Sequence, residues 1–248
     1  MHKVLITTVP FADKNKLPLD LLKASKIEYL INPLNKKLTE DELVEMVSDF
    51  DVIIAGTEQI TGRVMRKGSN LKLISRVGIG LDSVDLLTAE KMGIHVSYTP
   101  DAPAPAVSEL TIGMMLTLLR SVHVSNSQMH TNNWYRYFGK RLSEVTIGIV
   151  GVGRIGVGVL RHLRGFGSPK ILINDTVEKL EIEQEFSVER SSKEKIYKEA
   201  DVITLHLPLT HLTKNMIRRE HLLSMKKDAI LINTSRGGIV NEDDLYDV

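Results

Sequence analysis

The stretch Thr146-Ile-Gly-Ile-Val-Gly-Val-Gly-Arg-Ile-Gly156 decides the fold of this chain. Its first five residues are typical of a buried strand, and apolar residues recur at helical spacing after its last glycine. A strand that passes through Gly-x-Gly-x-x-Gly into a helix matches the first turn of a dinucleotide-binding unit. There the glycines permit a tight turn, close approach of the backbone to a pyrophosphate, and close packing of helix on strand. The start of the helix offers N–H groups to the phosphates.

A second strand and an acidic residue support this interpretation. Lys170–Asn174 predicts the next strand, and Asp175 follows it, 19 residues after Gly156. A carboxylate at about that spacing binds the adenosine ribose hydroxyls in such units. It repels a 2′-phosphate, so NAD is favoured over NADP as the cofactor. Glycines kept only for packing, as in a flavodoxin-like turn, are the alternative, which the matched Asp175 disfavours.

Short apolar runs alternate with helical patterns along the whole chain. The runs are rich in Ile, Val and Leu with little apolar–polar alternation, which is typical of parallel strands covered by helices on both faces. The predicted strands are Val4–Val9, Ile27–Ile31, Asp51–Ala55, Leu71–Ser75, Ile94–Tyr98, Thr146–Val150, Lys170–Asn174, Asp201–His206 and Ala229–Asn233. The fold class is therefore α/β with a doubly wound parallel sheet.

A boundary between two α/β units is predicted near residues 98–107. The segment Thr99–Pro105 holds three of the eight prolines and interrupts both periodicities. We therefore expect one unit at residues 1–98 and a second, with the glycine motif, at 99–248. The sequence also predicts where two helices begin. Thr39–Glu42 reads as a capping box, and Asn241 reads as an N-cap followed by acidic residues.

Composition excludes several classes of protein. Of the 248 residues, 42% are hydrophobic and 25% charged, which excludes a disordered chain. The formal net charge of +1 argues against nucleic acid as a partner. Cysteine is absent, which excludes disulfides, thiolate metal sites and a cysteine nucleophile, and fits a cytoplasmic location. The longest apolar stretch, Ile112–Leu119, is far shorter than the ~18 residues of a membrane span.

Four motifs, in order, give the chain a resemblance to the D-isomer-specific 2-hydroxyacid dehydrogenases. They are Ser75–Asp85 (SRVGIGLDSVD), Gly151–Gly156 (GVGRIG), Leu205–Thr210 (LHLPLT) and Asn233–Val240 (NTSRGGIV). The nearest subgroup resembles 3-phosphoglycerate dehydrogenase. The resemblance implies a flavodoxin-like substrate domain at 1–98 and a Rossmann NAD-binding domain at 99–248, incomplete at its C-terminal end. It also implies NAD-dependent hydride transfer at the CH–OH group of a D-2-hydroxy acid.

The resemblance assigns a role to each motif. The residues implied in cofactor binding are Gly151, Gly153, Arg154, Ile155 and Gly156 at the pyrophosphate, Asp175 at the ribose, Leu207 and Pro208 in the cleft, and Thr234, Ser235 and Arg236 beside the nicotinamide. Those implied in binding the substrate carboxylate through backbone N–H groups are Val77, Gly78 and Ile79. Arg236 would be the catalytic arginine. Its planar, permanently charged fork suits a 2-oxo acid, because it can hold the carboxylate and stabilise charge on the carbonyl oxygen.

Two features depart from the family pattern. Family members supply the proton donor and acceptor with a histidine oriented by a glutamate, both after the arginine motif, and this chain has only 12 residues after Arg236. We therefore expect the N-terminal portion of a longer enzyme, or a truncated chain that keeps NAD binding and loses turnover. His206 is the one histidine at a strand end near the expected cleft, where a hydrogen-bonded turn residue is the favoured interpretation. Ala55 stands where phosphoglycerate enzymes carry an arginine, so another 2-hydroxy acid is a candidate substrate.

Three functional hypotheses remain open from the sequence. The first is an NAD-dependent D-2-hydroxyacid dehydrogenase, the second a non-catalytic NAD-binding or regulatory protein, and the third a structural α/β protein. The resemblance also implies a homodimer through the cofactor domain, with Ser121–Arg141 extending across the partner. Four aromatic residues of that stretch suit an apolar interface: Trp134, Tyr135, Tyr137 and Phe138. Ordinary core packing is the alternative for the apolar helix before it.

Overall fold

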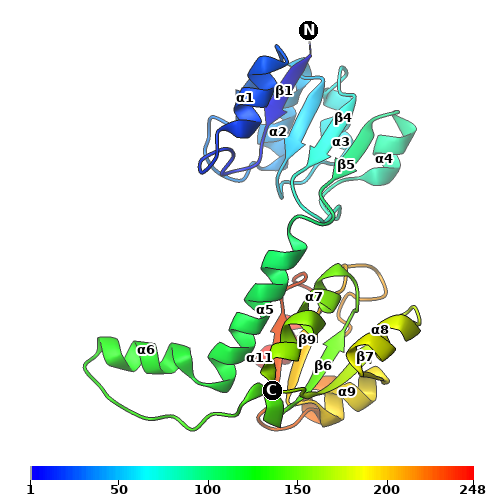
Figure 1. Ribbon diagram of the computed structural model, residues 1–248. Coiled ribbons are helices and arrows are strands. Elements are labelled where there is room, and N and C mark those ends of the chain that lie inside the picture. The colour runs from blue at the N-terminus through cyan, green and yellow to red at the C-terminus, as the bar shows by residue number, and fades with distance from the viewer. Residues whose placement is uncertain (1) are drawn as a thin grey trace. The chain divides into compact units, whose positions relative to one another are not determined.

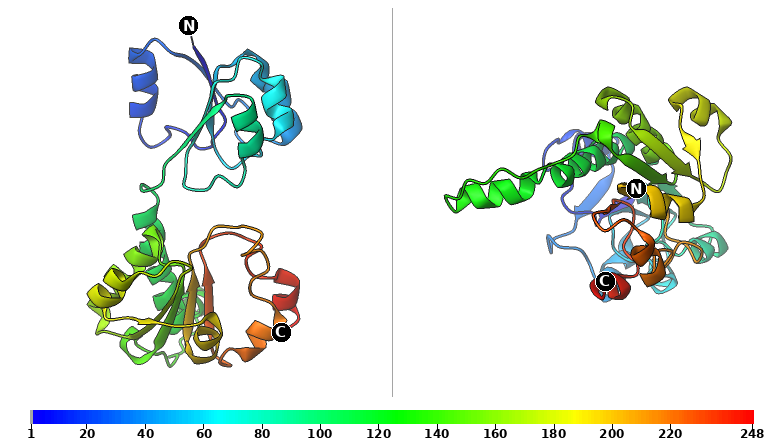
Figure 2. Two further views of the ribbon diagram at one scale, coloured as in Figure 1. Left: turned by 90° about the vertical axis from the view of Figure 1, so that its right-hand side faces the viewer. Right: turned by 90° about the horizontal axis from the view of Figure 1, so that it is seen from below.

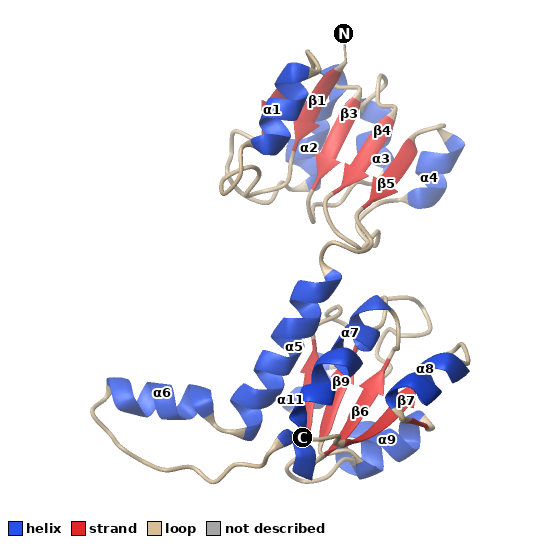
Figure 3. Cartoon of the chain, in the orientation of Figure 1, coloured by secondary structure: helices blue, strands red, loops and turns tan. Residues whose placement is uncertain are grey.

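The computed structural model describes residues 2–248 and divides into two compact units, one ending at Pro103 and one spanning Ala104–Val248 (Figure 1). The division lies inside the proline-rich segment that interrupts the sequence periodicities. Each unit is a parallel sheet with its own hydrophobic core. Figure 3 shows helices on both faces of each sheet. Among the helices of residues 2–248, none is long and apolar enough to cross a bilayer.

The first unit has five parallel strands in the order β2-β1-β3-β4-β5. This 2-1-3-4-5 order is that of a flavodoxin-like sheet, as predicted. Its strands are β1 (Lys3–Ile6), β2 (Glu28–Ile31), β3 (Val52–Ala55), β4 (Leu73–Arg76) and β5 (His95–Tyr98). Its helices are α1 (Leu17–Ala24), α2 (Glu40–Met46), α3 (Gly62–Lys67) and α4 (Leu86–Lys91), with a 3₁₀ turn at Val47–Asp49.

The second unit also has five parallel strands, in the order β10-β9-β6-β7-β8. Numbered within the unit, this is 5-4-1-2-3, the doubly wound order with its reversal between β6 and β9. The strands are β6 (Thr146–Val150), β7 (Lys170–Asn174), β8 (Glu189–Arg190), β9 (Val202–Leu205) and β10 (Ile230–Asn233). The helices are α5 (Ala104–Leu119), α6 (Val122–His130), α7 (Arg154–Leu163), α8 (Leu180–Phe186), α9 (Lys193–Glu199), α10 (Arg219–Ser224) and α11 (Glu242–Tyr246).

Local chemistry explains where these elements begin. Thr39 Oγ1 accepts from the Glu42 N–H at 3.3 Å, and the Glu42 carboxylate accepts from the Thr39 N–H at 2.9 Å, which confirms the capping box of α2. Asn241 caps α11 by accepting from the Asp244 N–H at 3.1 Å, also as predicted. Helix α5 begins at Ala104, and Pro105 is tolerated in its first turn because a proline there loses no helical hydrogen bond.

Most predicted strands lie within one or two residues of the observed bounds, and the largest departures are at β1 and β8. The predicted run Val4–Val9 ends as a strand at Ile6, although Thr7 still donates its N–H to the carbonyl of Ile54 at 2.9 Å. Strand β8 escapes prediction because it has only two residues, both polar and exposed, at the edge of the sheet. Such a strand carries no apolar pattern, and pairing with β7 alone creates it.

A chain of polar side chains joins β9, β10 and α5 inside the second unit. The imidazole of His206 lies 3.0 Å (Nε2) from Thr204 Oγ1 and 3.5 Å (Nδ1) from Thr234 Oγ1. Thr234 Oγ1 in turn lies 3.3 Å from Thr111 Oγ1 on α5. His206 is thus the hydrogen-bonded residue that the sequence analysis favoured. Burial lowers the pKa of its imidazole to about 4, because the protein interior solvates the charged form poorly.

The depressed pKa of His206 predicts a pH-dependent stability. Between about pH 6.5 and pH 4 the unfolded chain binds a proton here that the folded chain does not, so the free energy of unfolding falls as the pH falls. The loss approaches roughly 3 kcal/mol at pH 4. His206→Gln, which keeps hydrogen-bonding groups but does not titrate, should flatten this dependence in urea unfolding between pH 4.5 and 7. His211→Gln, at an exposed position, is the control. An unchanged pH slope in His206→Gln would contradict the assignment.

Candidate functional site

The turn from β6 into α7 brings three glycines to the reversal point of the second sheet. Gly151 has φ +95°, and a Cβ there would lie 2.4 Å from the carbonyl oxygen of His206, at the end of β9. A Cβ on Gly156 would lie 2.2 Å from the carbonyl oxygen of Gly151. These two glycines therefore let the turn press against its neighbours.

Gly153 differs from the other two glycines. It is the N-cap of α7 in an extended conformation that any residue adopts, and a Cβ there would meet no atom of the chain within 4 Å. The space over the start of α7 is therefore open. Arg154 and Ile155 follow in the first turn, where backbone N–H groups lack acceptors within the helix. Open space beside the start of a ten-residue helix fits a pyrophosphate.

Asp175 follows β7 and bonds to the glycine turn. Its Oδ2 accepts from the Val152 N–H at 2.8 Å, and its Oδ1 accepts from the Val177 N–H at 3.1 Å. Burial opposes ionisation, but these two N–H groups and the nearby Lys179 ammonium outweigh it, so the pKa of Asp175 lies below its ordinary value. A carboxylate, rather than a carboxylic acid, therefore stands at the end of β7.

The ends of β9 and β10 are tied together by Ser235. Its Oγ donates to the carbonyl of Leu205 at 2.5 Å and accepts from the Leu207 N–H at 3.0 Å. Arg236 is half-buried, and its Nη1 donates to the carbonyl of Ser235 at 2.8 Å. Because Asn233 pairs with Leu205 in register, the turn that carries Arg236 lies at the same sheet edge as the LHLPLT loop.

The structure thus places the predicted cofactor residues together at the carboxyl ends of the parallel strands of one sheet, here called the edge of the second sheet. Val150 pairs with Asn174 on one side and Leu205 on the other, so the three strands end level with one another. Asn233, the last residue of β10, pairs with Leu205, and the residues that follow these four strand ends include all those that the sequence analysis assigned to the cofactor. The glycine turn, the Asp175 carboxylate and the Arg236 turn form an arrangement that fits a dinucleotide.

The three residues assigned to the substrate carboxylate follow β4 in the first unit. The Val77 N–H donates to the carbonyl of Ala55 at 2.9 Å, continuing the sheet, and the Gly78 N–H donates to Thr99 Oγ1 at 2.8 Å. Gly78 has φ +140°, a region that favours glycine. Within residues 2–248 the N–H of Ile79 meets no acceptor, so it is the donor most readily offered to an anion.

Sequence reasoning missed two buried charged residues at this edge. Arg76 is 7% exposed, donates to the carbonyl of Val77, and pairs in register with Ala55, where the phosphoglycerate pattern expects an arginine. Glu58 is 2% exposed and accepts from the Thr7 hydroxyl and, at 2.8 Å, from the Gly56 N–H. Arg76 is the last residue of β4, and Glu58 lies in the loop after β3. A single charged residue at or after a strand end carries no periodic pattern that would predict its burial.

Comparison with known proteins agrees with this geometry. Residues 112–248 match the family described as D-isomer specific 2-hydroxyacid dehydrogenase, NAD binding domain. The chain is 36% identical over 216 residues to a hydroxypyruvate reductase of Thermotoga maritima, covering 86% of this chain and 69% of the relative. It is 35% identical over 252 aligned residues to a D-3-phosphoglycerate dehydrogenase of Methanocaldococcus jannaschii, covering 100% of this chain but 46% of the relative.

A solved structure with bound ligands also resembles the chain. It is a D-lactate dehydrogenase of Aquifex aeolicus complexed with NAD and lactic acid, with a TM-score of 0.85 and 28% identity. The match covers 99% of this chain and 72% of that one. Sequence and structure therefore agree on one assignment. The chain belongs to the D-isomer specific 2-hydroxyacid dehydrogenases, and residues 112–248 match their NAD-binding domain.

Proposed function

We propose that the protein formed by this chain is an NAD-dependent oxidoreductase of D-2-hydroxy acids, with residues 1–98 as the substrate domain and 99–248 as the cofactor domain. The observation that carries the proposal is the edge of the second sheet, where an open helix start at Gly153, the Asp175 carboxylate and the Arg236 turn come together. The first supports pyrophosphate binding, the second ribose binding, and the third contact with a carboxylate or carbonyl oxygen.

In this reaction NAD, when bound, supplies the hydride acceptor. Oxidation moves the C2 hydrogen of the hydroxy acid to the nicotinamide as hydride, and the hydroxyl proton leaves to a base, which gives the 2-oxo acid. The Arg236 guanidinium is the group proposed to hold the carboxylate and to stabilise negative charge on the C2 oxygen. In the first unit, the Ile79 N–H and the Gly78 loop are proposed to bind a substrate carboxylate.

Small 2-oxo acids and phosphorylated ones are both candidate substrates. The relatives named above include a hydroxypyruvate reductase and a D-3-phosphoglycerate dehydrogenase. Ala55 lacks the charge of the arginine expected for a phosphate, whereas Arg76 lies beside it on the next strand. We propose a phosphoglycerate dehydrogenase-like enzyme and include glyoxylate and hydroxypyruvate in its substrate panel.

Two glycine substitutions separate cofactor binding from folding. Gly153→Ala should keep the melting temperature of the apo protein, because its Cβ meets nothing in the chain, yet weaken NAD binding on the order of tenfold or more by filling the space beside the phosphates. Gly156→Ala should lower the apo melting temperature by several degrees, because its Cβ collides with the Gly151 carbonyl. Calorimetric titration and thermal melting check both. Normal NAD affinity in Gly153→Ala would argue against a pyrophosphate at this turn.

Arg236→Lys tests the proposed catalytic group in the protein as its own cell makes it. Because a lysine lacks the planar fork, we expect kcat/KM for D-2-hydroxy acids to fall by about 10²-fold or more. The dissociation constant for NAD should change little. Initial rates of NADH formation over the substrate panel provide the measurement. A wild-type protein that binds NAD but oxidises no acid of the panel would instead favour a non-catalytic NAD-binding protein.

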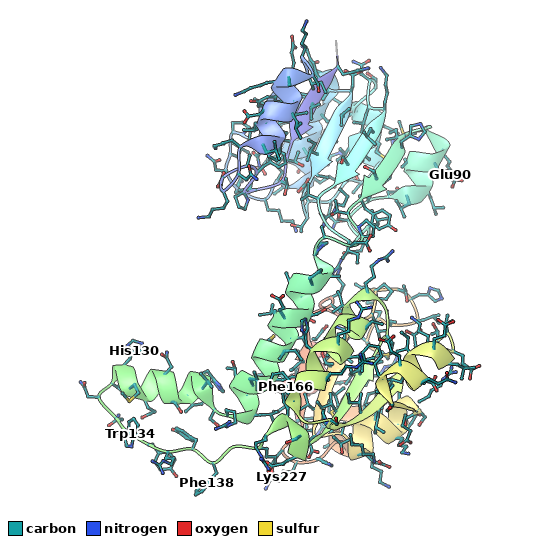
Figure 4. All side chains as sticks on the ribbon, in the orientation of Figure 1. Glu90, His130, Trp134, Phe138, Phe166 and Lys227 are labelled. Atoms are coloured by element: carbon teal, nitrogen blue, oxygen red, sulfur yellow. The ribbon has the colours of Figure 1, made fainter. Side chains whose placement is uncertain are left out.

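We further propose a homodimer formed through the cofactor domain. Helix α6 and residues 131–141, here called the arm, extend away from the sheet of the second unit (Figure 2). Trp134 and Phe138 lie on the arm (Figure 4), and they are 78% and 97% exposed. Val122 and Met129 on α6 are also about half exposed. Large apolar side chains gathered on one projecting segment are typical of a protein–protein interface.

Light scattering tests the dimer directly. At micromolar concentration the wild-type protein should have twice the mass of its chain, and the double change Trp134→Ser, Phe138→Ser should shift it toward the monomer, because the arm loses its largest apolar groups. Leu87→Ser, at a 70% exposed position of the first unit, is the matched control and should remain dimeric. A monomeric wild type would contradict the proposal.

A further inference from the structure

A lysine lies beside the carboxylate that is proposed to bind the adenosine ribose. Lys179 follows Asp175 by four residues, and its Nζ lies 3.6 Å from Asp175 Oδ2. The same ammonium donates to the carbonyl oxygen of Val152, inside the glycine turn. The two side chains are 29% and 18% exposed, so the pair is screened by water only in part. An ammonium therefore stands between the turn and the ribose-binding carboxylate.

The backbone of Lys179 is held in place, whereas its side-chain ammonium can move. Its carbonyl accepts from the Glu183 N–H at 3.0 Å, in the first turn of α8. The four-carbon side chain can rotate while the backbone stays in place. The neighbouring acid, Glu178, pairs with Arg190 Nη1 at 3.2 Å, and that pairing offsets its negative charge. Lys179 can therefore turn from the Val152 carbonyl toward an anion near Asp175.

The charge of Asp175 is what should discriminate between the two nicotinamide dinucleotides. A bare carboxylate accepts hydrogen bonds from both ribose hydroxyls and repels a 2′-phosphate. A lysine ammonium beside it offsets that repulsion and attracts phosphate as a point charge. The sequence motif alone favours NAD over NADP. The ion pair in the structure predicts a weaker preference.

We propose that Lys179 is a selectivity-determining residue, which lets the site bind a dinucleotide phosphorylated on the adenosine ribose (NADP) as well as NAD. The inference rests on the proposed function, because it requires a dinucleotide at this edge. A purely structural role for Lys179, as a tie between Asp175 and Val152, makes a different prediction. Removal of a tie weakens both cofactors equally, whereas removal of a phosphate ligand changes their ratio.

The test measures dissociation constants of NAD and NADP by calorimetric titration of the whole protein. In Lys179→Met, we expect the ratio of the NADP constant to the NAD constant to rise on the order of tenfold. Lys179→Arg keeps the charge and should keep the ratio near that of the wild type. Lys170→Met is the matched control, because Lys170 begins the strand that Asp175 follows and pairs with Glu199 at 3.1 Å. This control removes one positive charge at the amino end of β7, away from Asp175.

A double-mutant cycle isolates the lysine from the carboxylate. Asp175→Ser should tighten NADP binding while Lys179 is present, and this gain should shrink severalfold in the Asp175→Ser, Lys179→Met variant. Thermal melting of each apo variant shows that it is folded. An unchanged ratio in Lys179→Met, with NAD still bound, would overturn the inference and leave the proposed function intact. A wild-type protein that binds neither dinucleotide would contradict the proposed function, and the inference with it.

Discussion

The contact between the β6–α7 turn and the end of β9 is the constraint on which the second unit depends. No side chain fits at Gly151, where a Cβ would lie 2.4 Å from the His206 carbonyl oxygen, or at Gly156, where it would lie 2.2 Å from the Gly151 carbonyl oxygen. Because β6 lies between β7 and β9, this one turn fixes where α7 starts and which loops stand beside it. The geometry of the site therefore begins with backbone packing, before any catalytic side chain is considered.

Polar side chains then hold the neighbouring loops to that turn. Asp175 bonds the Val152 N–H, Ser235 bridges Leu205 and Leu207, and His206 lies between Thr204 and Thr234. Each of these links joins or lies beside strand ends at the same edge of the sheet. Loops ordered in this way lose less conformational entropy when a ligand binds, so the links favour binding in addition to any contact that they make with the ligand.

The sequence predicted the arrangement of strands better than it predicted which charged side chains lie next to one another. Strands Thr146–Val150 and Lys170–Asn174 are found at their predicted bounds, because buried parallel strands leave continuous apolar runs. The residues of the glycine turn and Asp175 could be chosen from spacing alone. Lys179 and Arg76 could not, since their neighbours come from register and loop folding, which no local pattern encodes. Strand β8 was missed for the same reason, because its partner strand makes it.

Asp175 and Gly153 differ in what they can reveal about the site. The Asp175 carboxylate supports the glycine turn through Val152 and forms an ion pair with Lys179, so a change there disturbs folding, electrostatics and any ribose contact together. A Cβ at Gly153 would lie within 4 Å of nothing else in the chain, so a substitution there affects only a ligand that enters the open space. A residue that holds the protein together is weak proof of a ligand. A substitution at Gly153, which the fold leaves open, is therefore a more specific test of cofactor binding than one at Asp175.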